Sequence, residues 1–148
     1  KMKKLILLLF LALYSYAITP FSLENLKELN VKFLNKQKTI SDELAEKITK
    51  KVKEKLENIG IKTKTDKYSY FKMSIKIDKF GETTFVRTLI MVQEDVEILR
   101  DEPFKFMALT YEKRDDFEAE NLEKDIYESF IDYLLEDFIE QYKAENSE

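Results

Sequence analysis

Cysteine and histidine are both absent from this sequence, and their absence excludes several kinds of site. Thiolate and imidazole groups are the usual ligands of zinc. In cysteine-dependent enzymes the thiolate is the nucleophile and a histidine is the base that activates it. A serine–histidine–aspartate triad also needs a histidine. Without disulfides, the fold must be stabilised by packing alone. We therefore expect no cofactor, no lipid anchor on a cysteine and no enzymatic activity.

Glycine is almost as scarce, since Gly60 and Gly81 are the only two in 148 residues. They stand in different predicted elements, so no glycine-rich loop that could surround a phosphate group is possible. Tryptophan is absent, whereas the chain has 8 tyrosines and 11 phenylalanines. The chain thus has aromatic groups for a core and no nucleotide-binding motif.

Charged residues are plentiful, and the formal net charge is −4. An acidic chain repels phosphate backbones, so nucleic-acid binding would need a concentrated basic patch. The densest lysine group, within residues 47–55, alternates with glutamates on one predicted helix. That arrangement is typical of a solvated helix face. We expect no nucleic-acid partner.

The first 17 residues have the layout of a secretory signal peptide. Lys3 and Lys4 give a positive start, residues 5–13 are an apolar run, and Ser15 and Ala17 place small residues before a cleavage site. The apolar stretch is shorter than the roughly 20 residues that span a bilayer. We expect a cleaved leader over residues 1–17, then a single domain over residues 18–148 that is periplasmic or secreted, from a bacterium, with no permanent membrane anchor. A retained anchor or a buried helix is the alternative.

Hydrophobic periodicity predicts two helices and four strands. One helix starts after Ser41, a good N-cap, and stops at Gly60. The second covers residues 122–142, with Asn121 as its cap and fraying from residue 143. The strands are expected at residues 29–34, 67–78, 83–99 and 104–112. This β-α-β-β-β-α order predicts an α+β fold: a two-layer sandwich in which two amphipathic helices pack on one face of a mostly antiparallel sheet of about four strands.

Carboxylates are the one chemically active group in good supply. The densest set lies between the last strand and the last helix, where a loop is expected, and could hold Ca²⁺ through several oxygens. Acidic residues before a helix N-terminus are also favoured by the helix dipole without any ligand. These two interpretations, and paired-acid catalysis as a third, stay open for these residues: Asp115, Asp116, Glu118 and Glu120.

The face of the sheet away from the helices is the main candidate site. The strand patterns place large apolar side chains there with no predicted helix over them, and an apolar patch of several hundred Å² usually marks an interaction site. Alternatively, the sheet coils, or residues 18–26 fold across this face, and the patch is buried internally. The register of residues 104–112 stays open, so this strand adds either Phe104, Phe106 and Ala108 or Lys105, Met107 and Leu109 to that face. The candidate surface consists of Tyr70, Phe85, Arg87, Leu89 and Met91.

These observations favour a non-enzymatic interaction or adaptor domain that binds a protein or envelope component through this sheet face or an edge strand. The alternative is a small carrier of an apolar ligand or lipid. A homodimer is possible. The order of elements over residues 18–148 resembles that of small envelope proteins, such as the lipopolysaccharide-assembly lipoprotein that partners an outer-membrane barrel and the lipoprotein auxiliaries of lipid transporters. The resemblance implies envelope assembly or transport.

Overall fold

The computed structural model describes residues 22–35 and 38–147. The predicted leader over residues 1–17 lies outside the described residues. The predicted order of elements is confirmed: β1 (Asn30–Leu34), α2 (Asp42–Asn58), β2 (Ser69–Phe80), β3 (Thr83–Ile98), β4 (Phe104–Glu118) and a final helix. The final helix is continuous but changes its pitch, from α3 (Leu122–Glu128) through a π-helical segment η1 (Ser129–Leu134) to α4 (Leu135–Asn146).

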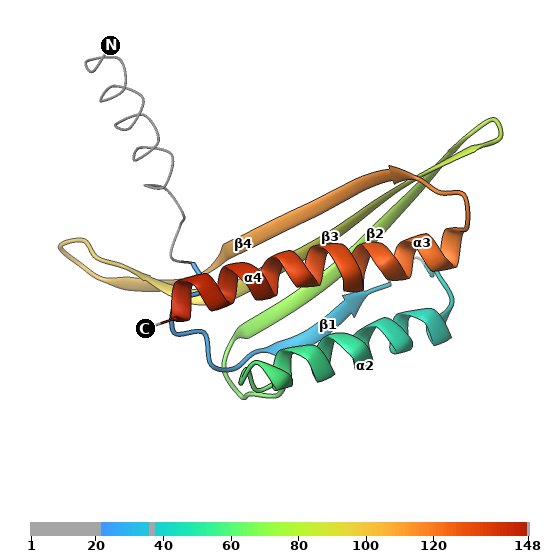
Figure 1. Cartoon of the computed structure of the whole chain (residues 1–148). Helices are drawn as coiled ribbons and strands as arrows, with labels where there is room; N and C mark the ends of the chain where they lie inside the picture. Colours follow the sequence, from blue (N-terminus) through green and yellow to red (C-terminus); the bar gives the residue numbers. More distant parts are fainter. Residues whose placement is uncertain (1–21, 36–37, 148) are drawn as a thin grey trace, which may run out of the picture.

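The four strands form one mixed sheet in the order β1-β2-β3-β4. β1 is parallel to β2, with α2 as the connection, and the other neighbouring pairs are antiparallel. Both helices lie on the same face of this sheet (Figure 1). The predicted α+β two-layer sandwich is therefore confirmed. No helix among the described residues is long and apolar enough to cross a membrane.

The predicted starts of both helices and the predicted end of α2 are confirmed. The Ser41 side chain accepts from the Leu44 backbone N–H, and Asn121 caps α3 in the same way. Such caps satisfy backbone donors that have no partner within the helix. Gly60 follows α2 with φ +88°, and Gly81 has φ +61° in the two-residue turn between β2 and β3. Both glycines thus occupy the left-handed conformation that other residues avoid.

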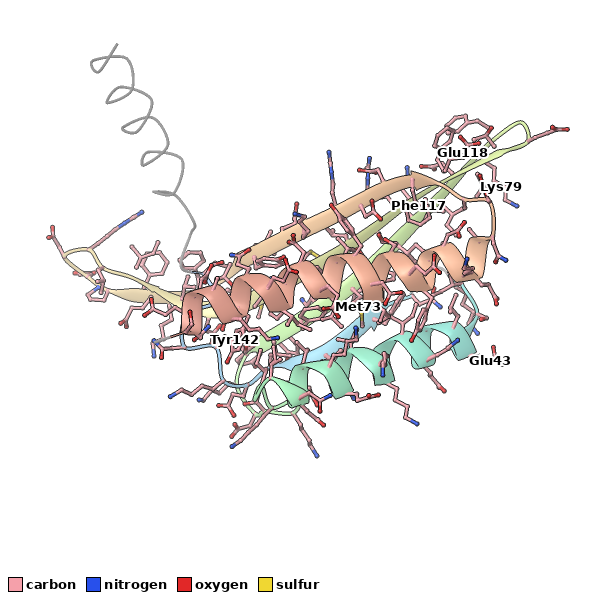
Figure 2. All side chains as sticks on the ribbon, in the orientation of Figure 1. Glu43, Met73, Lys79, Phe117, Glu118 and Tyr142 are labelled. Carbon is pink, nitrogen blue, oxygen red and sulfur yellow. The ribbon has the colours of Figure 1, made fainter. Side chains whose placement is uncertain are left out.

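The core fills the space between the sheet and the two helices. Phe138 of the final helix contacts Phe71 of β2 and Tyr111 of β4, with 5.2 Å between ring centroids in both pairs. Met73 is fully buried in the same layer, whereas Lys79 and Glu118 lie near the end of the β2–β3 hairpin, away from the core (Figure 2). One contiguous hydrophobic cluster joins all the elements.

Two expected boundaries are wrong, and both elements are longer than predicted. β4 continues to Glu118, six residues beyond the expected end, and the final helix continues to Asn146 instead of fraying. The π segment also went unpredicted. Apolar residues four apart drift around an α-helix by about 40° per step, because its turn has 3.6 residues. The wider π turn offsets this drift and keeps Phe130, Leu134 and Phe138 buried on one side.

The described chain begins against the end of its last helix. The Leu23 backbone N–H donates to the Glu145 carboxylate at 2.6 Å, and the Asn25 backbone N–H donates to the Asn146 side-chain oxygen at 2.8 Å. Leu23 itself is fully buried. Residues 22–26 therefore close one end of the core, beside the C-terminus of α4 (Figure 1).

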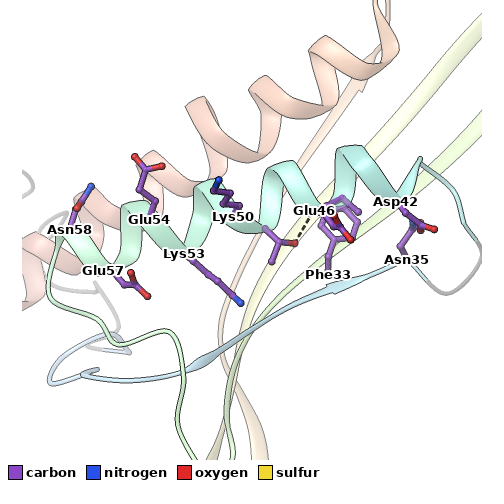
Figure 3. Close-up of a pocket in the computed structure, with 11 residues that line it drawn as sticks. Phe33, Asn35, Asp42, Glu46, Lys50, Lys53, Glu54, Glu57 and Asn58 are labelled. Atoms are coloured by element: carbon purple, nitrogen blue, oxygen red, sulfur yellow. Dashed lines mark hydrogen bonds between the residues drawn. The ribbon is translucent and has the colours of Figure 1, made fainter.

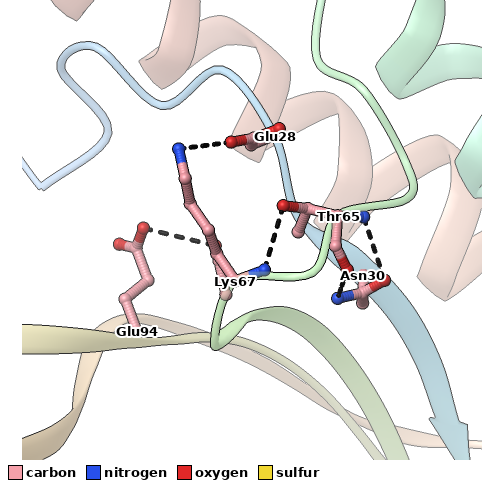
Figure 4. Close-up of polar contacts among 6 residues, drawn as sticks. Glu28, Asn30, Thr65, Lys67 and Glu94 are labelled. Carbon is pink, nitrogen blue, oxygen red and sulfur yellow. Dashed lines mark hydrogen bonds and ion pairs between the residues drawn. The ribbon is translucent and has the colours of Figure 1, made fainter.

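A polar network fixes the loop that leads into β2 (Figure 4). Asn30 donates from its side-chain amide to the Thr65 carbonyl at 2.8 Å and accepts from the Thr65 backbone N–H at 3.2 Å. Lys67 pairs with Glu28 at 2.5 Å, and the hydrogen bond to Lys67 lowers the pKa of the Glu28 carboxyl. This loop is thereby held against the start of β1.

Two hairpins extend beyond the helical layer, one at each end of the sheet (Figure 1). We call residues 93–109, at the β3–β4 end, the arm. A β-bulge lies at its root, because Val92 pairs with Tyr111 whereas Gln93 pairs with Leu109, which leaves Thr110 as the extra residue. A bulge locally reverses which residues of a strand point to which face.

Candidate interaction surface

The sheet face opposite the helices, here called the open face, carries all five predicted residues. Along β3, the buried side chains of Val86, Thr88, Ile90 and Val92 point toward the helices. The residues between them point to the opposite face, because side chains alternate along a strand. The register with β2 adds Tyr70 to the same face. The structure thus brings together Tyr70, Phe85, Arg87, Leu89 and Met91.

The open face is less apolar at its centre than expected. Leu89 and Met91 are only partly exposed. Phe85 is 46% exposed, and its ring contacts that of Phe80 at 6.0 Å near the β2–β3 turn. None of these side chains is fully enclosed by the described residues.

The open face also carries three exposed residues near the arm: Tyr68, which the sequence analysis missed, and Met107 and Leu109, which belong to one of its two register alternatives. The bulge places Met107 and Leu109 on this face, opposite Asp95 and Gln93, and Tyr68 lies next to them at the start of β2. Their exposed fractions are 39%, 51% and 61% respectively. The bulge has no clear signal in the sequence, which is why the register of this strand could not be predicted.

Two lysines without ion pairs flank Tyr70. Lys32 of β1 lies directly opposite Lys72 of β2. Their ammonium nitrogens lie 4.2 and 5.3 Å from the centroid of the Tyr70 ring. Lys72 also donates to the Gln93 side chain, and neither lysine has a carboxylate partner in the described part of the chain. Like charges directly opposite repel, so this corner of the open face carries uncompensated positive charge.

The other side of the open face carries compensated charge. Arg87 donates to the Asp116 carboxylate at 2.6 Å, and Arg114 lies 3.3 Å from the second oxygen of the same carboxylate. All three side chains are about half exposed. Exposed pairs of this kind contribute little to stability, so these side chains can rearrange toward a partner at low cost.

The expected acidic loop does not exist, because most of its residues belong to β4. The pleat of the strand sends Asp115 toward the helices, whereas Asp116 and Glu118 point to the open face. Only Glu120 stays in the connection to α3. No group of three or more potential metal ligands occurs among the described residues. The calcium interpretation therefore loses the loop on which it depended.

Asp115 instead takes part in a buried hydroxyl cluster at the π segment. The Ser129 hydroxyl donates to the Asp115 carboxylate at 2.8 Å, and the Thr88 hydroxyl lies 2.5 Å from the Ser129 oxygen. Thr88 is fully buried. Ser129 is buried as well, so the cluster ties β3 and β4 to the final helix.

Tyr111 is the buried titratable group beside the final helix. Its hydroxyl donates to Asp137 at 3.3 Å, and Asp137 also pairs with Lys113 at 3.2 Å. Burial, and next the negative charge of Asp137, raise the pKa of the Tyr111 hydroxyl well above its usual value. The group therefore stays neutral and acts as a hydrogen-bond donor between sheet and helix.

A groove also runs between α2 and the outer edge of β1 (Figure 3). Phe33 forms its apolar floor, and Thr49 on its wall is tied to the helix by donating to the Ala45 carbonyl at 2.7 Å. Most of the lining is charged, with both signs present, including Glu46, Lys50, Lys53, Glu54 and Glu57. Charges of both signs on one wall do not favour a polyanion.

No family model and no curated protein matches this sequence.

Proposed function

We propose that this chain is an exported, non-enzymatic interaction domain that binds a protein or envelope component through the open face of its sheet. The observation that carries the proposal is the composition of that face. Tyr68, Tyr70, Met107 and Leu109 gather on a surface over which no helix of the described chain lies. Tyrosine, methionine and arginine are the residue types enriched in protein interfaces.

The charges of the open face support a partner with acidic groups. Lys32 and Lys72 present positive charge next to the aromatic patch, while the domain as a whole is acidic. Charge complementarity of this kind speeds encounter and selects the partner more than it adds affinity. A partner that places carboxylates over this corner would pair with both ammonium groups and would bury the Tyr70 ring.

The rest of the molecule supports binding over catalysis. The hydroxyl cluster of Ser129 and Thr88 is buried and joins the sheet to the final helix, which suits a structural role. The groove beside β1 has one aromatic ring among charges of both signs, whereas the open face exposes several aromatic and aliphatic side chains. Export, for which the leader pattern is the support, would bring the domain to the envelope.

The test is partner capture with two variants of the open face and one control. Tyr68→Glu and Phe85→Glu each put a carboxylate on an exposed side chain of this face, so we expect the cross-linked partner to be lost while the fold persists. Tyr133→Glu changes a side chain of similar exposure on the final helix and should capture normally. Equal capture by all three variants would refute binding through the open face.

A further inference from the structure

The outer edge of β4 is protected along only half of its length. β4 is the last strand of the sheet, so one side of its backbone has no partner strand among the described residues. In residues 112–118, six of seven side chains are charged, whereas in residues 104–110 only Lys105 is charged. Soluble proteins normally protect edge strands with charges, because an uncharged apolar edge readily pairs with another strand. The unprotected half is the half that lies on the arm.

This segment is also apolar on both of its faces. Phe104 and Phe106, 49% and 40% exposed, pair with Ile98 and Val96 on the helix side, beyond the end of the helical layer. Met107 and Leu109 point to the open face. A strand that is apolar on both faces is typical of the interior of a larger sheet. Residues 104–110 therefore have the composition of an inner strand, although they lie at the edge of the sheet.

We propose that residues 104–110 pair with the same segment of a second copy of this chain. The two strands run antiparallel about Met107, so that the two four-stranded sheets join into one sheet of eight. Such a contact is self-complementary and closes as a two-fold dimer. It goes beyond the proposed open-face function and does not depend on it.

The register about Met107 suits the side chains of the segment. Phe106 then lies opposite Ala108 of the second copy, and Lys105 lies opposite Leu109, so no charge within the segment faces a like charge. Because Thr110 is the extra residue of the bulge, Glu112 is only two pairing positions beyond Leu109 and points to the open face. Lys105 of the second copy lies opposite Leu109, so Glu112 is its diagonal neighbour. Diagonal neighbours are about 7–8 Å apart, within reach of long side chains. Glu112 has no ion pair in the described chain. The dimer therefore gains two ion pairs, each between Glu112 of one copy and Lys105 of the other.

The shape of the molecule leaves room for this contact. Antiparallel pairing puts the two helical layers at opposite ends of a strand pair about 24 Å long, at roughly 3.4 Å per residue. The helices do not extend over the arm (Figure 1). Membrane insertion of the arm is disfavoured, because Arg100, Asp101 and Glu102 form its tip and would have to enter the bilayer. A second copy is therefore the occupant that the charges favour.

The first test is sedimentation equilibrium of the domain from about 1 µM to about 1 mM, the range in which modest interfaces dissociate. We expect a monomer–dimer equilibrium. Met107→Lys would place two ammonium groups face to face on the two-fold axis and should weaken the dimer by about tenfold or more, with an unchanged circular dichroism spectrum. Tyr133→Lys, on the final helix, should dimerise normally. A monomer at every concentration, or a dimer that Met107→Lys does not weaken, would overturn the proposal.

The second test reads the register and needs no charged variant. Because the chain has no cysteine, Met107→Cys would introduce a single thiol. Opposite residues of antiparallel strands have Cα atoms about 4.5–5.5 Å apart, which a disulfide can bridge. We expect Met107→Cys to form a covalent dimer on mild oxidation, whereas the matched control Lys105→Cys should not, because its thiols would lie four residues apart. Equal cross-linking of both, or a monomer that binds lipid vesicles or a different protein through residues 104–110, would contradict pairing of two copies about Met107.

Discussion

The buried hydroxyl cluster at the π segment makes a sharp prediction about stability. Ser129 has one hydroxyl proton, and it goes to the Asp115 carboxylate, which can only accept. Thr88 must therefore donate to the Ser129 oxygen. The two residues are thus unequal: Thr88 depends on Ser129 as its acceptor, whereas Ser129 keeps its own acceptor without Thr88.

This inequality gives different costs for the two single substitutions. Thr88→Val replaces the hydroxyl by a methyl group of similar size and removes one hydrogen bond, at a cost of about 1 kcal/mol. Ser129→Ala leaves the Thr88 hydroxyl buried without an acceptor and also removes the bond to the carboxylate, at a cost of about 2–3 kcal/mol. In the double variant the unsatisfied hydroxyl is gone, so we expect it to be about 1 kcal/mol more stable than Ser129→Ala alone.

The assay is urea unfolding followed by circular dichroism. The free energies of unfolding are compared among variants that share the same m-value, the slope of the free energy against urea concentration. Ser74→Ala, on the partly exposed open face, is the matched control and should change the free energy of unfolding by less than about 0.5 kcal/mol. A double variant that is less stable than Ser129→Ala would refute the donor assignment, because the two losses would then simply add.

Three further predictions concern the core, the charge state and the turn. Phe138→Ala should cost about 3–5 kcal/mol in urea unfolding, since it removes two buried ring contacts, and equal loss from the exposed Phe85→Ala would contradict this packing. Because the folded state raises the pKa of Tyr111, only the unfolded chain ionises above about pH 10, so stability should fall by up to about 1.4 kcal/mol per pH unit there. The Tyr111→Phe variant should not show this fall in stability above about pH 10. Parallel stability–pH profiles of the variant and the parent would contradict the assignment to Tyr111. Gly81→Ala should lower the melting temperature more than Gly81→Asn, because φ is +61° and asparagine tolerates it better; the reverse order would contradict the turn geometry.

Much of the fold could be predicted because local signals agree with the tertiary structure. Ser41 and Asn121 each cap a helix, Gly81 makes a turn, and the alternation from Phe71 onward gives a strand with one buried face. Each signal depends on a few neighbouring residues. The five residues of the candidate surface followed from the same alternation, so their common face could be predicted as well.

The errors occur where distant contacts decide the conformation. Residues 113–118 are mostly charged and favour a loop by composition, yet β3 offers them a backbone partner along its whole length. The bulge at Thr110 and the π segment each insert a residue to match the packing of another element. Neither has a local signature, which is why the sequence alone could not decide whether Met107 and Leu109 lie on the open face.

The contact between residues 22–26 and the end of α4 places both ends of the described chain side by side (Figure 1). A tag, linker or fusion partner attached at either end would thus emerge from one pole of the molecule, near the root of the arm. The opposite pole, with the turn at Gly81, would stay unobstructed. Joining the two ends with a short linker and opening the chain at that turn should therefore give a circular permutant with the same sheet order.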